Sequence, residues 1–166
     1  MAGVAVHDIS FRGLAGAIFG VLAVALILLV VGLASAGWNI TYNENGTSRN
    51  VGLWETCVCT SNNDVADWHK ATQAMITIGL IFLVFCCICV FIYMCIHTLS
   101  KNKTIMALTA LCFLTALFLL IGIIIWGVKM PSNLHWSFAL TIIAMLTTIV
   151  AGVLSIVQMR KAGVDP

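Results

Sequence analysis

The chain has 166 residues, about the length of one domain, of which 61% are hydrophobic and only 8% are charged. A soluble domain is about 45–50% apolar and about 25% charged, so this composition excludes an ordinary water-soluble protein and predicts a membrane protein. The net charge of +2, without any run of basic residues, gives no indication of a nucleic-acid partner.

Four uncharged apolar runs are each long enough to cross a bilayer, which takes about 20 helical residues. They cover about residues 13–36, 71–96, 105–128 and 136–159. Backbone groups in lipid must be paired internally, and the runs show no strict alternation, so each is predicted to be a helix rather than a barrel strand. The sequence thus predicts a single four-span, all-α membrane domain, folded as a compact left-handed four-helix bundle.

The first run contains glycines at a spacing that lets helices approach closely. Gly16 and Gly20 form a GxxxG step, and Gly13 extends it. Two interpretations are open: these glycines pack inside the four-helix bundle, or they form a dimer face. The alternative that this run is a cleaved signal peptide is disfavoured, because its apolar core is longer than the usual span of about 7–15 residues.

The polar segment 37–70 is predicted to form an outer loop that carries a small antiparallel sheet. Asn39–Tyr42 alternates polar and apolar residues as a strand does, and Val51–Thr60 is again strand-like. Between them, the Asn-Gly step in Asn43–Thr47 is typical of a turn. Asn45 begins a glycosylation sequon in this loop; Asn39 begins another, but it adjoins the membrane and is the less favoured site.

The remaining connections and the charges predict the orientation. Residues 97–104 form a tight hairpin and residues 129–135 a short second outer loop, so consecutive spans are antiparallel neighbours. One side of the membrane receives Arg12, Lys101, Lys103, Arg160 and Lys161. The other receives Arg49, Lys70, Lys129, the sequon at Asn45 and all five tryptophans. The positive-inside rule then places both termini in the cytoplasm of a multi-pass plasma-membrane protein.

The spans themselves contain no Asp, Glu, Lys or Arg, which argues against a pump, a proton-coupled transporter or a voltage sensor. Their polar residues are mostly hydroxyls that can bond to their own helix, such as Thr77, Thr115, Thr147 and Thr148. No metal or other cofactor is predicted, since His7 and His69 have no partners at ligand spacing. Cys89 and Cys95 are candidate palmitoylation sites, or else small buried hydrophobic residues.

One set of outer-loop residues carries a family resemblance. Trp38, then Gly52-Leu53-Trp54, then Cys57 resemble the W…GLWxxC signature of the claudin, peripheral myelin protein, epithelial membrane protein and lens fibre intrinsic membrane protein superfamily. The segment from Trp68 to Ile76 is similar to the start of the second span in the epithelial membrane protein branch, and the short second outer loop also suits that branch. The tail 162–166 lacks the ending with which claudins bind PDZ scaffolds.

The resemblance implies a role for the motif residues. Trp38, Leu53 and Trp54 are expected to tuck between the sheet and the outer helix ends and so fix the loop on the bundle. The alternative is three unrelated interfacial aromatic and apolar residues. Cys57 and Cys59 depart from the family pattern, because residues i and i+2 of a strand lie about 6.5–7 Å apart, near the limit for a disulfide. A bridge between them, free thiols and an intermolecular bond all stay open.

The resemblance also implies a function. The leading hypothesis is a non-enzymatic organiser of cell contacts or membrane domains at cell junctions, acting through lateral and trans association with itself and other membrane proteins. A second hypothesis is an auxiliary subunit of a channel or receptor. A third, a thiol oxidoreductase that uses Cys57 and Cys59, is disfavoured because the nearest charged residue, Glu55, opposes a thiolate. No small-molecule substrate is predicted.

Overall fold

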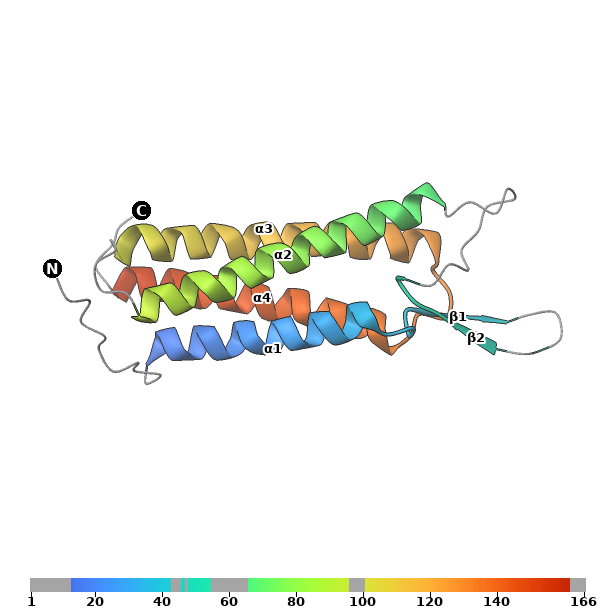
Figure 1. Ribbon diagram of the computed structural model, residues 1–166, viewed down its shortest axis with the longest axis horizontal. Coiled ribbons are helices and arrows are strands. Elements are labelled where there is room, and N and C mark those ends of the chain that lie inside the picture. The colour runs from blue at the N-terminus through green and yellow to red at the C-terminus, as the bar shows by residue number, and fades with distance from the viewer. Residues whose placement is uncertain (1–12, 43–45, 47, 55–65, 96–100, 162–166) are drawn as a thin grey trace, which may run out of the picture.

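The computed structural model describes residues 13–42, 46, 48–54, 66–95 and 101–161. Over this part of the chain, four helices and two short strands follow one another in the order α1 Leu14–Ala34, β1 Asn39–Tyr42, β2 Ser48–Val51, α2 Asp67–Cys95, α3 Lys101–Lys129 and α4 Trp136–Lys161 (Figure 1). Each helix is long and apolar enough to cross a membrane. The predicted four-span helical architecture is therefore confirmed.

The helices run alongside one another as a bundle, in which α1 packs mainly on α4, α2 mainly on α3, and α3 also on α4. The two strands project from one end of the bundle, which we call the sheet end (Figure 1). The start of α1 and the end of α4 both lie at the opposite end. An even number of antiparallel helices requires this arrangement.

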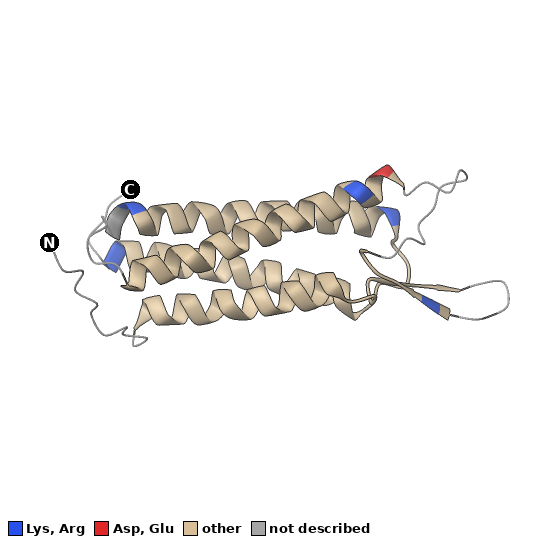
Figure 2. Ribbon diagram, viewed as in Figure 1, with Lys and Arg blue, Asp and Glu red and all other residues tan. Residues whose placement is uncertain are grey.

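Charged side chains lie at the two ends of the bundle or on the sheet, and the middle of each helix is free of them within the described residues (Figure 2). Two helices begin earlier than the apolar runs suggest. Helix α2 begins at Asp67 rather than near Ala71. At this start, the backbone N–H groups of His69 and Lys70 both donate to the carbonyl of Ala66. Helix α3 begins at Lys101. These extra turns carry the charged residues beyond the apolar segments.

Close helix packing depends on small residues, but not on the ones that the sequence suggested. A Cβ atom at Gly79 would lie 2.6 Å from the Leu119 side chain, and one at Gly32 would lie 2.9 Å from Thr141 Oγ1. By contrast, a Cβ at Gly13 or Gly20 would have nothing within 4 Å. Packing inside the bundle is therefore the wrong interpretation for Gly13 and Gly20; the dimer face stays a prediction.

Threonine hydroxyl groups within the helices form hydrogen bonds with carbonyls of their own helix. Each of the four threonines predicted to do so donates to the carbonyl four residues earlier, over 2.7–2.8 Å: Thr77, Thr115, Thr147 and Thr148. Because each hydroxyl is paired within its own helix, it needs no partner elsewhere. The local-bonding prediction is confirmed.

The sheet is antiparallel and pairs Asn39 with Val51 and Tyr42 with Ser48. Strand β1 covers the predicted residues, whereas the second strand was placed too late: β2 ends at Val51, where it was expected to begin. The strand ends because the chain turns at Gly52 toward Ser35 and Ala36, the two residues that directly follow α1. Residues 55–60, the rest of the predicted strand, lie outside the described residues.

Candidate functional site at the sheet end

The sheet is fastened to the connection between α3 and α4. Three backbone hydrogen bonds of 2.8–3.1 Å join the base of the sheet to this connection and to the start of α4: from Ile40 N to Asn133 O, from His135 N to Trp38 O, and from Ser137 N to Gly37 O. A fourth, of 3.0 Å from Trp38 N to Val51 O, closes the base of the sheet itself. Asn39 and Leu134 also form an antiparallel bridge. Asn133 has a positive φ of 62°, which asparagine tolerates better than most residues and which turns its carbonyl toward β1. The connection thus lies along the free side of β1.

Trp38 is the central anchor of this end. Its side chain is 0% exposed, and its indole Nε1 donates to the carbonyl of Gly32 in the last turn of α1 over 2.7 Å. Its ring meets Trp126 edge-on at a centroid distance of 5.0 Å and Phe138 at 5.9 Å. A buried indole removes roughly 200 Å² from solvent, worth a few kcal/mol at about 25 cal/mol per Å². Trp38 thus lies between the base of the sheet and the ends of α1, α3 and α4.

Leu53 is the second anchor, and its backbone is held as firmly as its side chain. The side chain is fully buried, and the carbonyl lies 2.7 Å from both His69 Nε2 and Gln73 Nε2. A carbonyl can only accept, so His69 carries its proton on Nε2 in this contact. His69 and Gln73 are four residues apart on α2 and therefore share one face. Two side chains of α2 thus bind one atom of the loop.

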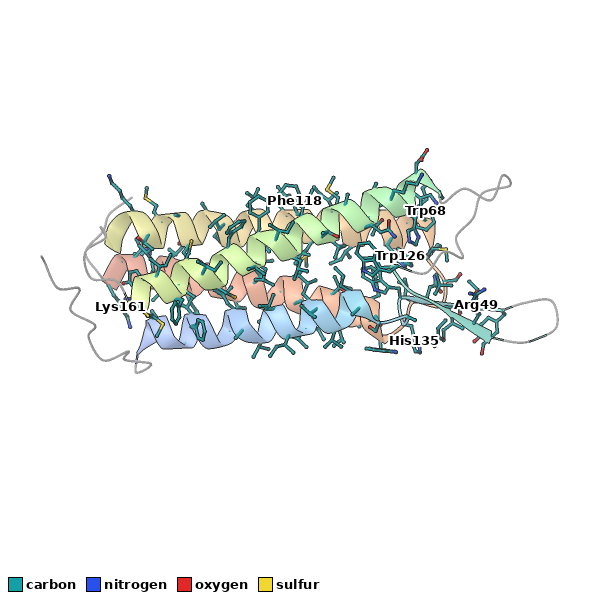
Figure 3. All side chains as sticks on the ribbon, in the orientation of Figure 1. Arg49, Trp68, Phe118, Trp126, His135 and Lys161 are labelled. Atoms are coloured by element: carbon teal, nitrogen blue, oxygen red, sulfur yellow. The ribbon has the colours of Figure 1, made fainter. Side chains whose placement is uncertain are left out.

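An aromatic cluster connects these anchors across the helices. Trp126 of α3 contacts Trp68 at 5.6 Å and His69 at 5.3 Å, in addition to Trp38 (Figure 3). Trp126 Nε1 and His69 Nδ1 are buried and make no hydrogen bond within the described chain. Edge-to-face rings of this kind add about 0.5–1.5 kcal/mol per pair beyond their buried area. The cluster ties α2, α3 and the base of the sheet into one unit.

Gly52 is required because the chain passes against backbone. A Cβ at this position would lie 2.8 Å from Ala36 Cα and 3.2 Å from the Ser35 carbonyl oxygen. Real Cβ atoms essentially never show the first of these distances and seldom the second, and neither contact atom is a flexible side-chain tip. Any other residue here would push the turn away from α1. The Gly-Leu-Trp step therefore has a physical reason for its glycine and its leucine.

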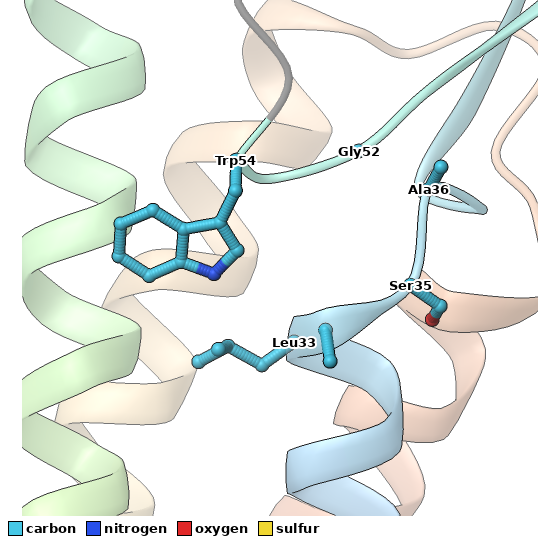
Figure 4. Close-up of a pocket in the computed structure, with 6 residues that line it drawn as sticks. Leu33, Ser35, Ala36, Gly52 and Trp54 are labelled. Atoms are coloured by element: carbon cyan, nitrogen blue, oxygen red, sulfur yellow. The ribbon is translucent and has the colours of Figure 1, made fainter.

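Trp54 is placed differently from the prediction. Its side chain is 52% exposed, so it is not tucked beneath the sheet as Trp38 is. It lines a small pocket with Leu33, Ala34, Ser35, Ala36 and Gly52, and Figure 4 shows its indole reaching toward Leu33 on the α2 side of α1. The correction has a simple cause: Leu53 occupies the inward position, so the next side chain points outward.

Several predicted sites are not described by the structure or are changed by it. Asn45, Cys57 and Cys59 lie outside the described residues, so glycosylation of Asn45 and the state of the two thiols stay predictions. Asn39 is 2% exposed and paired with Val51, which leaves it unavailable for glycosylation in the folded protein. Cys89 and Cys95 are partly buried. Their palmitoylation is untested.

The residues that sequence reasoning missed are those that receive the loop: His69, Gln73, Trp126 and Phe138. A signal existed on α2, where two polar residues stand four apart at the start of an apolar helix. No comparable signal marked Trp126 or Phe138, because an aromatic residue at a span end is expected at the membrane interface in any case.

No protein-family model matches the sequence, and no curated protein is significantly similar to it. Within the described residues, no group of three or more His, Cys, Asp or Glu side chains is placed to hold a metal ion. What the sheet end does show is a set of contacts that hold a short sheet in a fixed position on a membrane-spanning bundle.

Proposed function

We propose that this four-span membrane protein is a non-enzymatic organiser of membrane domains or cell contacts, which associates laterally with other copies through α1. The sheet end would then be presented in a fixed orientation on the outer side of the plasma membrane. The observation that carries this proposal is the surface that α1 turns away from its own bundle.

That surface, which we call the α1 outer stripe, consists of exposed residues spaced alternately four and three apart: Gly13, Ala17, Gly20, Val24, Ile27 and Val31. The buried residues of α1 follow the same spacing on the other side: Ile18, Leu22, Ala25, Leu29 and Gly32. A repeat of 3.5 residues is the geometry of two helices packed along their length at a small crossing angle. Helix α1 therefore has two faces suited to helix packing, and the bundle uses one.

The composition of the outer stripe supports association rather than simple solvation by lipid. Lipid tails are as apolar as the helix, so helices associate through close backbone contact, which small residues permit. The half of the stripe that lies away from the sheet end consists of the small residues Gly13, Ala17 and Gly20. The large neighbouring residues Ile18 and Leu22 point into the bundle instead. A flat surface of this kind best fits an equally flat one, and a second copy of α1 offers it.

The proposal has a second part, association in trans, in which the sheet of one copy meets a partner on a facing membrane, and the sheet end supports it. Lys103, Arg160 and Lys161 lie at the opposite end, which the positive-inside rule assigns to the cytosol. The sheet would then face outward, projecting beyond the helix ends, with Tyr42 and Arg49 exposed. Because its base is held by backbone hydrogen bonds, little ordering would be needed when it meets a partner.

The test is to count subunits in a native-like membrane. Single-molecule photobleaching of a fluorescent fusion in bilayers is expected to show dimers or larger assemblies of the wild type. Gly20→Ile should shift the distribution toward monomers, while the fold stays intact because Gly20 is exposed and nothing lies within 4 Å of the new Cβ. The matched control is Ala110→Ile, also an exposed small residue but on α3, which should leave the distribution unchanged.

Two results would contradict the proposal. One is an unchanged subunit distribution for Gly20→Ile. The other is a monomeric wild type that co-purifies with a larger channel or receptor, which would favour the auxiliary-subunit hypothesis instead.

A further inference from the structure

The pocket beside Trp54 combines an apolar floor with a hydrogen-bond donor that finds no partner in the described part of the chain. Leu33 and Ala34, in the last turn of α1, form the floor, and Trp54 forms one wall (Figure 4). Among the described residues, Trp54 makes no hydrogen bond, and Figure 4 shows the nitrogen edge of its indole turned toward Leu33. The donor therefore points along the helix toward the membrane rather than away from it.

The position of this indole is fixed by its neighbours. Gly52 lies against the backbone of Ala36, and the carbonyl of Leu53 is bound by His69 and Gln73. The two residues before Trp54 are therefore held on α1 and on α2, respectively. A side chain that is half exposed yet held from the backbone in this way is preorganised for binding.

The position of the pocket across the bilayer identifies the lipid groups that surround it. Helix α1 ends at Ala34, so the pocket lies at the edge of an apolar span of 21 residues, a length that matches the hydrocarbon layer. Tryptophan favours this interface because its ring is apolar while its N–H needs an acceptor. In a phospholipid bilayer the acceptors at this depth are the ester carbonyls that join each acyl chain to glycerol.

We propose that this pocket binds one phospholipid of the leaflet at the sheet end. The Trp54 Nε1–H donates to an ester carbonyl oxygen of the lipid, and the first methylenes of the acyl chain lie on Leu33 and Ala34. The rest of the chain follows the boundary between α1 and α2, which pack less extensively against each other than the other neighbouring pairs do.

The size of the pocket favours a phospholipid over a sterol. The space open to the centres of water-sized atoms is about 80 Å³, and about 10–15 Å³ of such space holds one water molecule, so the pocket takes a group of several heavy atoms. An ester group with its first methylenes has this bulk, whereas a rigid sterol ring system is several times larger. The lipid inferred here is therefore held at its glycerol end and is mobile at its tail.

The experiment measures lipid retention directly. The full chain, reconstituted with phosphatidylcholine and then stripped with mild detergent, is analysed by native mass spectrometry. The wild type is expected to retain one phosphatidylcholine. Trp54→Phe keeps the ring but removes the donor and should lower the retained fraction on the order of fivefold, as expected for one neutral hydrogen bond. The matched control is Trp136→Phe, since Trp136 is 47% exposed at the same end.

A second variant keeps the inference testable if Trp54→Phe fails to fold. Ala34→Phe leaves the Trp54 donor in the sequence but fills the pocket from its exposed floor with a ring, and it should abolish retention. Equal retention by the wild type and both pocket variants would overturn the inference. So would an equal loss in Trp136→Phe, or retention of cholesterol in place of phosphatidylcholine from mixed bilayers.

Discussion

The two tryptophans of the W…GLW motif should differ strongly in their contribution to stability. Trp38→Ala removes a fully buried indole, a hydrogen bond to Gly32 and edge contacts with two aromatic rings. Truncating a buried Trp typically costs about 3–5 kcal/mol, and the upper part of that range is expected here. Trp54→Ala removes a side chain that is 52% exposed, so about half the buried area is lost and about 2 kcal/mol or less is expected.

Equilibrium unfolding in mixed micelles, titrated with a denaturing detergent and followed by helical circular dichroism, measures both values on one scale. A third variant, Trp38→Phe, separates the ring from its N–H and should cost about 1–2 kcal/mol, because the Gly32 carbonyl loses its 2.7 Å donor. Equal costs for the two alanine variants would refute the assignment of Trp38 as the anchor and Trp54 as a surface residue.

The remaining predictions concern the turn at Gly52 and the two side chains of α2 that bind the Leu53 carbonyl. Gly52→Ala should destabilise the sheet end by about 1–3 kcal/mol, because its Cβ meets backbone. Gly127→Ala should cost less, because its Cβ would lie 3.8 Å from the Phe138 ring, an ordinary contact distance. The same unfolding titration compares the two variants. His69→Leu and Gln73→Leu should each destabilise the protein. The loss of unfolding free energy in the double variant should differ from the sum of the two single losses by at least about 0.5 kcal/mol, because both side chains donate to the Leu53 carbonyl. Strict additivity in this double-mutant cycle would argue against a shared acceptor.

The sequence predicted the helices well, because a long apolar run leaves the backbone one way to satisfy its hydrogen bonds in lipid. It could not predict which face of each helix points inward. These spans are apolar on all sides, so amphipathicity gives no direction, and Gly20 was as plausible inside the bundle as Gly79. Only the packed helices distinguish the two.

At the sheet end, too, features set by neighbouring residues in the chain could be predicted, whereas features set by distant residues could not. Strand β1 was predictable from its alternation, but the end of β2 is set by the approach of Gly52 to Ala36, sixteen positions away in the chain. The inward turn of Leu53 and the outward turn of Trp54 follow from that approach. The motif identified the residues that matter but not the direction in which each one points.

The backbone bonds between residues 37–40 and the segment Asn133–Ser137 have a consequence for biogenesis. The ribosome makes the segment that contains Trp38 and the sheet early, yet the partners that fix its base belong to the last quarter of the polypeptide. Trp38 can reach Phe138 only after the fourth helix has entered the bilayer. A truncated or stalled chain that lacks the fourth helix would therefore carry Trp38 without the ring of Phe138 and without the backbone bonds that hold the base of the sheet.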